Sequence, residues 1–574
     1  MNDQQAGSRH AKLDPGSCRT NSPPTPCPMV INVTPSAYEF PLLIKQLLIT
    51  PIARASQHQI VSINGLRYGY PELVRRIARL AQTLDRLQVS PGATVAVMDW
   101  DGHRYLEGYF AIPMSGRVLQ TVNIRLSPEQ ILYTLDHAQS EVVIVHPDFL
   151  PLLEPILDRL GRVRVIIDID DAPISDQRHV GSYEALMAEA PDAYAFPDFD
   201  ERTQATIFYT SGTTGLPKGV YYSHRQIVLH TMALLATYGT APAQGRVTED
   251  DVYMPITPMF HAHAWGWPYA ATLLGMKQVY LGRYTPEKVI DAIRTEQASF
   301  SHCVTTLLQM VLNDPSAADL DLRGFKFLIG GSALPEGLAR QALERGIDIF
   351  TGYGMSETGP MQVINHLSRE EAATDLDTQT RLRRRAGRPA ILCDIRTVDE
   401  QGTLLPRDGH SIGEIVFRSP WLTQGYFRNA ETSEALWSGG WMHSNDLGAM
   451  NPDGTLTLTD RLKDVIKTGG EWVSSLDLES LTSQHPAVEE AAFIGVPDAK
   501  WGERPMALVV LRAEHRAGCT TEHIRAHLLH HAEAGAIPKY AVPDRVQFVD
   551  ALEKTSVGKL DKKALRTRYA AATD

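Results

Sequence analysis

A glycine-rich loop that follows a hydrophobic run constrains the fold of this chain more than any other segment. Residues 209–220 read YTSGTTGLPKGV, and the apolar residues 205–208 before them predict a buried strand. Glycines let successive backbone N–H groups turn toward one point, the hydroxyls add donors, and Lys218 adds a positive charge. A strand that opens into such a loop is typical of α/β folds that hold phosphate groups.

The spacing in this loop differs from that of a Walker A loop, which requires G-x-x-x-x-G-K-[ST]. Here Leu216 and Pro217 separate Gly215 from the lysine, and a glycine follows it. The alternative interpretation is a flexible linker of Gly, Ser and Thr. A linker has no need of Pro-Lys-Gly fixed to a strand end, so we favour phosphate binding.

The length of the chain requires more than one domain. Its 574 residues exceed what one hydrophobic core can serve, so two to four domains are expected. Strand-like runs such as 94–98, 141–145 and 277–281 alternate with helical patterns, which predicts an α/β fold with parallel sheets flanked by helices. We place this large N-terminal core at residues 36–387.

The pattern changes after residue 387. Strand-like segments there alternate with turn signals such as Asp408-Gly409 and Asp453-Gly454, which predicts a β-rich subdomain over 388–462. The remaining stretch, 463–574, is long enough to form a small α+β domain, and we expect it to be mobile. Residues 1–35 are polar and rich in Pro and Ser, which predicts a disordered tail.

The composition excludes several classes of protein. A net charge of -12, with no basic stripe interleaved with aromatics, argues against a nucleic-acid partner. No apolar run is long enough for an integral membrane segment. Five cysteines without metal or disulfide spacing fit a reducing compartment, and we expect a cytoplasmic location. A basic cluster is expected to be a solvated loop face; it comprises Arg381, Arg383, Arg384, Arg385 and Arg388.

Two glycine-rich turns follow later strand-like runs. Residues 330–335 read GGSALP, and a glycine pair at a strand end permits the close approach of a flat ligand. Residues 352–358 read GYGMSET; Tyr353 offers an aromatic face, and Glu357 offers one hard oxygen ligand of the kind that Mg²⁺ prefers. Taken alone, this second turn with one exposed glutamate would be unremarkable.

Three further segments carry charged residues near glycines. Asp446 is expected in a short turn, WMHSNDLG, where its carboxylate could face two vicinal hydroxyls. Residues 460–472 combine alternating charge with a glycine pair, and residues 554–560 place Lys559 on a glycine-hinged loop. Without the other motifs, Lys559 would be interpreted as a solvated lysine of the tail.

Together and in this order, these segments resemble the adenylate-forming superfamily of acyl-CoA synthetases, peptide-synthetase adenylation domains and luciferases. The likeness runs from about residue 35 to about residue 570. Segments 258–272 (PMFHAHAWGWPYAAT) and 460–475 (DRLKDVIKTGGEWVSS) look most like bacterial medium- and long-chain fatty-acid–CoA ligases. They are also similar to ligases for short thioether acids such as methylmercaptopropionate.

The resemblance implies a two-step reaction with ATP, Mg²⁺ and coenzyme A. A carboxylate attacks the α-phosphate, giving an acyl-adenylate and pyrophosphate, and the thiol of coenzyme A then displaces AMP. The leading prediction is a medium-chain fatty-acid–CoA ligase. The alternatives are a ligase for a short thioether or aryl acid, an adenylation enzyme that loads a separate carrier protein, and a non-catalytic binder. A homodimer is expected by analogy alone.

The resemblance also assigns roles to residues. Lys559, Glu357, His261 and Lys218 are the expected catalytic residues, with Thr210 and Glu357 at the metal. Lys559 would bridge the carboxylate and the α-phosphate, and Lys463 would act as the hinge of the C-terminal domain. The expected ATP- or AMP-binding residues are Thr210, Ser211, Gly212, Thr213, Thr214, Gly215, Lys218, Gly331, Ser332, Ala333, Gly352, Tyr353, Gly354, Met355, Ser356, Thr358, Asp446, Arg461, Lys463, Lys467 and Trp472.

On the acyl side, the resemblance assigns His261 and Trp265 to the carboxylate end and the tunnel mouth; the alternative for His261 is a packed core histidine. The family's Gly-Val-Pro-Thr segment reads Cys-Val-Thr-Thr here, so Cys303 and Thr305 are expected to reshape the acyl pocket. The Thr-Gly that usually precedes the ribose aspartate is replaced by Ser-Asn. Gly469, Gly470 and Glu471 are expected on the coenzyme A side.

Overall fold

The computed structural model describes residues 31–170, 174–210, 216–555 and 559–570. The chain forms two compact units, Met1–Phe40 and Pro41–Asp574. In the first unit, residues 31–40 are exposed and contain no helix or strand. All sheets, and every site considered below, belong to the second unit.

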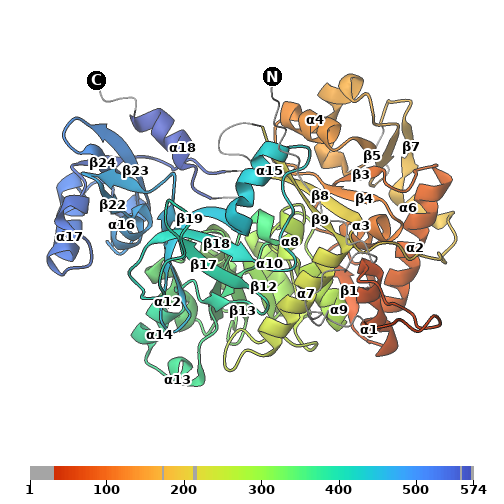
Figure 1. Ribbon diagram of the computed structural model, residues 1–574, viewed down its shortest axis with the longest axis horizontal. Coiled ribbons are helices and arrows are strands. Elements are labelled where there is room, and N and C mark those ends of the chain that lie inside the picture. Colours follow the sequence, from red (N-terminus) through yellow and green to blue (C-terminus); the bar gives the residue numbers. More distant parts are fainter. Residues whose placement is uncertain (1–30, 171–173, 211–215, 556–558, 571–574) are drawn as a thin grey trace, which may run out of the picture. The chain divides into compact units, whose positions relative to one another are not determined.

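The first sheet carries the predicted phosphate loop. It is parallel except at its last pair, where β8 and β9 run antiparallel. α3 (His103–Met114) packs on its central strands and α4 (Pro128–His137) on β5 (Ser140–Val145) (Figure 1). In spatial order its strands are β7 (His179–Ser182), β6 (Val165–Asp168), β5 (Ser140–Val145), β3 (Thr94–Met98), β4 (Val118–Thr121), β8 (Gln204–Thr210) and β9 (Lys218–Ser223).

A second sheet of nine strands has a parallel centre and antiparallel edges. A hairpin around Asn64-Gly65, a dipeptide typical of tight β-turns, forms one edge, where β1 and β2 pair antiparallel. In spatial order the strands are β16 (Arg388–Pro389), β15 (Val363–Ile364), β14 (Asp348–Tyr353), β13 (Lys326–Ile329), β12 (Phe300–Cys303), β10 (Val252–Tyr253), β11 (Lys277–Tyr280), β1 (Gln59–Ser62) and β2 (Arg67–Gly69).

Two smaller sheets follow in the chain. Both consist mainly of antiparallel pairs. The first contains β17 (Asp394–Val398), β18 (Gly413–Arg418), β19 (Met442–Met450) and β20 (Leu456–Arg461). The second contains β22 (Glu471–Val473), β21 (Ile466–Thr468), β24 (Gly502–Leu511), β23 (Val488–Asp498) and β25 (Arg545–Phe548).

The helices lie between and around the strands (Figure 1). Pro71 lies in the first turn of the first long helix, whose apolar residues face the core at helical spacing. The α-helices are α1 (Ile49–Ala53), α2 (Tyr70–Arg86), α3 (His103–Met114), α4 (Pro128–His137), α5 (Leu150–Leu153), α6 (Tyr183–Ala188), α7 (His224–Gly239), α8 (Ala262–Trp265), α9 (Trp267–Leu274), α10 (Pro286–Glu296), α11 (Thr305–Asn313), α12 (Glu336–Glu344), α13 (Arg369–Ala372), α14 (Leu376–Leu382), α15 (Ala430–Leu436), α16 (Ser475–Thr482), α17 (Thr521–Glu533) and α18 (Lys562–Leu565).

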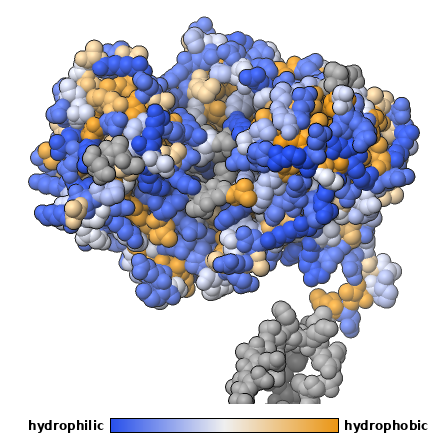
Figure 2. All heavy atoms as spheres, turned by 90° about the horizontal axis from the view of Figure 1, so that it is seen from above, coloured by the Kyte–Doolittle hydropathy of each residue, from blue (hydrophilic) through white to orange (hydrophobic). Residues whose placement is uncertain are grey.

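Separate hydrophobic clusters form the cores of these layers. Among the described residues, three clusters have their buried members within residues 44–364, one lies around the four-stranded sheet, and two lie within residues 466–570. The predicted fold class is therefore confirmed: parallel sheets flanked by helices, then a β-rich part, then a small α+β part. On the face shown in Figure 2, hydrophobic side chains gather in separate groups among hydrophilic ones.

Two local predictions were wrong. Asp446 lies within strand β19 rather than in a turn. The Ser-Asn pair before it does disturb the strand, because Asn445 has a left-handed φ of 59° and the pairing register shifts nearby. The basic cluster is not a uniformly solvated face: the Arg383 guanidinium is buried and donates to Asp348 Oδ1 at 2.7 Å.

Among the described residues, no helix is both long and apolar enough to cross a bilayer.

Candidate active site

The predicted phosphate loop joins two paired strands. Thr210 ends β8, Lys218 begins β9, and the two residues pair directly. Gly219 lies where a Cβ would come within 3.2 Å of Ile207, Tyr209 and Phe427, so a side chain there would disturb the packing. The expected phosphate-binding residues Ser211, Gly212, Thr213, Thr214 and Gly215 lie outside the described residues.

Tyr426 connects two of the predicted catalytic residues. The Lys218 ammonium lies 4.6 Å from the centre of the Tyr426 ring, and the Tyr426 hydroxyl donates to Glu357 Oε1 at 2.8 Å. Burial raises the pKa of Glu357, while this hydrogen bond and the charges of Lys218 and Lys559 oppose the rise. Tyr426 was not predicted from the sequence, because the residues around it form no distinct motif.

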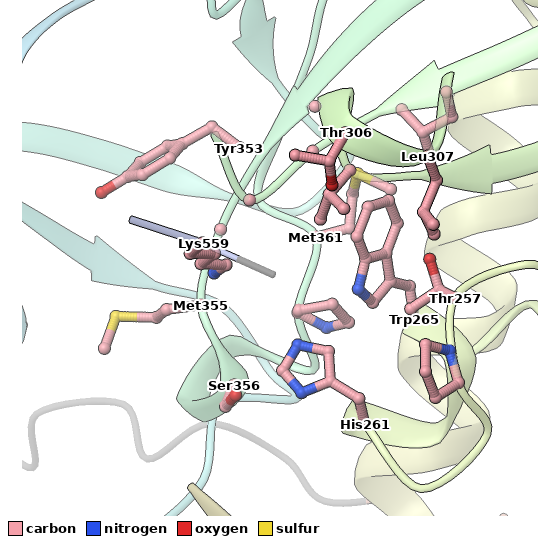
Figure 3. Close-up of a pocket in the computed structure, with 18 of the residues that line it drawn as sticks. Thr257, His261, Trp265, Thr306, Leu307, Tyr353, Met355, Ser356, Met361 and Lys559 are labelled. Atoms are coloured by element: carbon pink, nitrogen blue, oxygen red, sulfur yellow. The ribbon is translucent and has the colours of Figure 1, made fainter. Parts of the chain in front are cut away.

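A pocket opens at the carboxyl ends of the second sheet's parallel strands. It encloses about 800 Å³ of space, part of it open to solvent. Of the predicted nucleotide-binding residues, it is lined by Gly331, Gly352, Tyr353, Gly354, Met355 and Ser356. Figure 3 shows Tyr353, Lys559 and Met355 on one side and Trp265, Leu307 and Thr257 on the other.

The turn after β14 depends on a glycine. A Cβ on Gly354 would lie 1.5 Å from the carbonyl oxygen of Pro360, so no other residue fits there. Thr358, another residue expected at the nucleotide, does not belong to the pocket lining. Its side chain is buried, and its hydroxyl is engaged with backbone groups of Met355 and Pro360.

The remaining two residues of the GGSALP segment that were expected at the nucleotide lie beside the pocket. Ser332 and Ala333 are exposed and do not belong to its lining. The Ser332 hydroxyl lies 2.9 Å from that of Thr305. The turn of residues 330–334, called the nucleotide turn below, therefore contacts the start of α11.

Asp446, on β19, does not belong to the pocket lining but contacts Tyr353, which does. The Tyr353 hydroxyl donates to Asp446 Oδ2 at 2.7 Å, and Arg461 Nε lies 3.7 Å from Oδ1. Desolvation raises the pKa of Asp446, and Arg461 and the tyrosine hydrogen bond oppose the rise. The carboxylate is therefore held in place by an aromatic ring that itself lines the pocket.

Lys559 enters the pocket from the C-terminal part of the chain (Figure 3). Desolvation lowers the pKa of its ammonium to about 8, and the positive charge of Arg461 contributes to this lowering. The carboxylates of Asp446 and Glu357 act in the opposite direction. The structure thus places Lys559, Glu357 and Asp446 within electrostatic reach of one another.

His261 forms the lower wall of the pocket in Figure 3. Burial lowers its pKa to about 3, with further contributions from the charges of Lys559 and Arg125, so the imidazole is neutral at pH 7. The four residues that follow, Ala262–Trp265, all have left-handed φ values between 45° and 58°. Such a turn costs about 1–2 kcal/mol per residue, and it points the Trp265 ring into the pocket.

Trp265 packs tightly on the nucleotide turn. A Cβ on Gly330 would lie 2.9 Å from Trp265 Cη2. The indole ring also lies 5.1 Å from the His302 ring, measured between centroids. The alternative for His261, a packed core histidine, does not describe its position, since it lines the pocket together with Trp265.

Cys303 does not take the position predicted for it. Its side chain is fully buried in a core cluster, because it points to the opposite face of β12. Thr305 also lies outside the lining, and Val304, Thr306 and Leu307 line the pocket instead. Sequence reasoning also missed Arg125 and Tyr284, which follow β4 of the first sheet and β11 of the second; the Arg125 guanidinium donates to the Tyr284 hydroxyl at 3.1 Å.

The predicted residues between 463 and 472 lie outside the pocket lining. Lys467 and Trp472 pair across the β21–β22 hairpin, and Gly469 and Gly470 form its turn with left-handed φ values. The Gly469 N–H donates to the Trp501 carbonyl at 2.7 Å. Lys463 and Glu471 are exposed, and in this structure neither they nor the hairpin line the pocket that Lys559 enters.

Comparisons with known proteins agree with this geometry. Residues 52–427 match the family model of the AMP-binding enzymes, and residues 477–559 match that of the AMP-binding enzyme C-terminal domain. The chain is 38% identical over 506 residues to a long-chain-fatty-acid–CoA ligase of Thermus thermophilus, covering 88% of this chain and 90% of the relative. It is 35% identical over 539 residues to a 3-methylmercaptopropionyl-CoA ligase of Ruegeria pomeroyi, covering 92% and 97%.

The fold matches a solved structure as well. The anthranilate CoA ligase AuaEII, in complex with anthranoyl-AMP, superimposes with a TM-score of 0.82 at 24% identity, covering 93% of this chain and 99% of that one. The two family matches and the sequence relatives cover most of the chain. The chain therefore belongs to the AMP-binding enzymes, the adenylate-forming superfamily of acid–thiol ligases.

Proposed function

We propose that this protein is an AMP-forming acyl-CoA synthetase that activates a medium-chain fatty acid through an acyl-adenylate. The observation that carries the proposal is the entry of Lys559 into a pocket that Tyr353, which donates to Asp446, lines on one side and that His261 and Trp265 line on the other. The relatives from Thermus thermophilus and Ruegeria pomeroyi support an acyl-CoA ligase, since they are ligases for a long-chain acid and for a short thioether acid.

In the first step, a carboxylate oxygen of the acid bonds to the α-phosphorus of ATP, and the bond from that phosphorus to the pyrophosphate oxygen breaks. Because this step brings anions together, cations must offset their repulsion. Lys559 supplies one positive charge at the carboxylate and α-phosphate, and Lys218 supplies another at the outer phosphates.

The nucleotide is oriented by neutral and acidic groups. The Tyr353 ring offers a face for the adenine, and the Asp446 carboxylate accepts hydrogen bonds from the ribose hydroxyls. His261 stays neutral, so it shapes the carboxylate end of the acyl site without adding charge. In the second step, the sulfur of coenzyme A bonds to the acyl carbon, the thiol proton is lost, and AMP departs.

The donor set fits one Mg²⁺ ion held mainly by substrate. Within the described ranges, no group of three or more His, Cys, Asp and Glu side chains is arranged to hold a metal. Glu357 is a buried carboxylate whose hydrogen-bonding partner is a neutral phenol, so it suits a single hard-ligand position. Thr210, at the strand end that leads into the phosphate loop, is the second residue proposed at the ion. When bound, the ion would neutralise phosphate charge.

The lining of the pocket supports an aliphatic acid. Beyond His261, its walls are formed largely by the apolar side chains of Trp265, Val304, Leu307, Leu328 and Met361. A short thioether acid would fit the same surface, and an aryl acid would stack on Trp265. A separate carrier protein, in place of coenzyme A, is the other alternative for the acceptor.

The test is a panel of free acids with ATP, Mg²⁺ and coenzyme A, read as AMP formed. Straight-chain acids from four to sixteen carbons, 3-methylthiopropionate and benzoate distinguish the alternatives. The proposal predicts the highest kcat/KM near eight carbons. A maximum at sixteen carbons, or with 3-methylthiopropionate, would replace the medium-chain assignment, and no AMP with any acid would refute the activity.

Three further predictions belong to this proposal. They are the division at residues 35, 387 and 462, a homodimeric assembly, and a cytoplasmic location. The separate hydrophobic clusters of residues 466–570 support the last of the domain boundaries.

A further inference from the structure

Arg384 joins three segments that are far apart in the chain. Its Nε donates to the Leu334 carbonyl at 2.9 Å, Nη1 donates to Glu336 at 2.8 Å, and Nη2 donates to the Ser480 hydroxyl at 2.6 Å. Leu334 ends the nucleotide turn that begins at Gly330, and Ser480 lies in α16 of the C-terminal part. The Arg384 side chain is 20% exposed, so these contacts are largely shielded from water.

The C-terminal part also carries Lys559. Two contacts of Lys562 connect α16 to the segment that contains Lys559. Lys562, three positions after Lys559, is buried and lies 2.7 Å from Glu479, which precedes Ser480 in α16. Its ammonium also donates to the hydroxyl of Ser475 at the start of that helix. A force on α16 is therefore transmitted to the segment that bears Lys559.

The nucleotide turn thus contacts the C-terminal part at both of its ends. Near its start, Gly331 lies against the Lys559 side chain, and at its end Leu334 is bonded to Arg384 and through it to Ser480. Through α16 and Lys562, these contacts connect the two ends of the nucleotide turn to each other. The planar guanidinium suits this position because its donors point in fixed directions, which a lysine cannot reproduce.

We propose that Arg384 is a positioning residue for adenylation, because it ties α16 to the nucleotide turn and so holds Lys559 in the pocket. This inference rests on the function proposed above. The bond to Ser480 serves the step in which Lys559 is needed and is not required by the second step, in which the thiol attacks.

Ser480→Ala is the sharpest variant, since it removes the bond to α16 and leaves the bonds of Arg384 to Leu334 and Glu336. Arg384→Gln removes all three. Two neighbours serve as matched controls. Ser483→Ala removes a hydroxyl that donates to the Ser480 carbonyl but leaves the Ser480 hydroxyl and its bond to Arg384 in place, and Arg385→Gln removes a surface charge paired with Glu371.

Two rates are measured for each variant with the best acid. The first is acid-dependent exchange of pyrophosphate into ATP, and the second is conversion of supplied acyl-adenylate and coenzyme A to acyl-CoA. We expect Ser480→Ala and Arg384→Gln to lower the first rate about 10-fold, the size expected for losing a hydrogen bond to a charged group, and to leave the second within about 2-fold. Both controls should match the wild type.

A third readout does not depend on activity. In the enzyme without substrates, amine-reactive labelling of Lys559, followed by peptide mass spectrometry, should be several-fold faster in Ser480→Ala than in the wild type. Labelling of Lys277, which is paired with Glu296, should not change. The inference is overturned if Ser480→Ala leaves exchange and labelling unchanged, or if it lowers both half-reactions equally. A wild type without exchange on any acid would instead refute the proposed function, and the labelling result would still decide the role of Arg384.

Discussion

The Lys559 side chain packs directly on Gly331, so closely that a Cβ on Gly331 would lie 2.8 Å from Lys559 Cε and 3.3 Å from Nζ. Gly331 also has a left-handed φ of 79°. One residue of the nucleotide turn therefore sets the space in which the C-terminal lysine lies. This contact joins two motifs that are far apart in the sequence.

Gly331→Ala should impair adenylation more than stability. The added methyl displaces Lys559, and we expect acid-dependent pyrophosphate exchange to fall about 10-fold or more. Gly324→Ala is the matched control, because Gly324 has nearly the same φ of 78° but a Cβ there would meet no atom within 4 Å. Equal loss of exchange in both variants would show that backbone strain, rather than Lys559, is responsible.

The pH dependence of Lys559 reactivity follows from its surroundings. Burial lowers its pKa to about 8, so in the substrate-free enzyme its neutral, reactive form should appear with a midpoint near pH 8. An exposed lysine has a pKa of about 10.4. Adding ATP should slow the labelling and raise the midpoint, since phosphate charge favours the ammonium. A midpoint as high as that of an exposed lysine, without ATP, would contradict the desolvation of the Lys559 ammonium.

Asp101 should make stability depend on pH. It accepts a hydrogen bond from the Met259 N–H at 2.7 Å in the segment that leads to His261, and burial raises its pKa to about 8. Between about pH 4 and pH 8 the folded protein then binds one more proton than the unfolded chain, so this contribution to stability is lost as pH rises. The melting temperature of Asp101→Asn, relative to wild type, should increase from pH 5 to pH 8. A constant difference would exclude this role.

Tyr353→Phe should weaken nucleotide binding while keeping the aromatic face. It removes the hydroxyl that donates to Asp446, and a typical neutral donor contributes about 0.5–1.5 kcal/mol. We expect the KM for ATP to rise about 2- to 10-fold, with the KM for the acid unchanged. If the two KM values rose together, Tyr353 would shape the whole pocket rather than orient the Asp446 carboxylate that binds the ribose.

Much of the fold followed from local patterns. The hairpin at Asn64-Gly65, the helix opened by Pro71 and the strand before the phosphate loop all form where their residues predict them. These elements depend on turn chemistry and on periodic burial, which a short window of sequence records. Asp446 was misplaced because a polar Ser-Asn-Asp run is typical of a turn, whereas its strand is held by pairing on both sides.

The site was harder to predict where contacts join distant segments. Tyr426 contacts Glu357, and Arg384 contacts Ser480, across separations that no local pattern encodes. The direction of a side chain was also missed at Cys303, because alternation along β12 turns it away from the pocket. Arg125 could have been found from the rule that ligands bind at the carboxyl ends of parallel strands.

The most direct test of the account is pyrophosphate exchange by Lys559→Ala with the preferred acid. We expect a loss of about 100-fold or more, comparable to removing one preorganised charge from a transition state, while supplied acyl-adenylate is still converted to acyl-CoA. Exchange at the wild-type rate would contradict it, since Lys559 would then have no part in forming the adenylate.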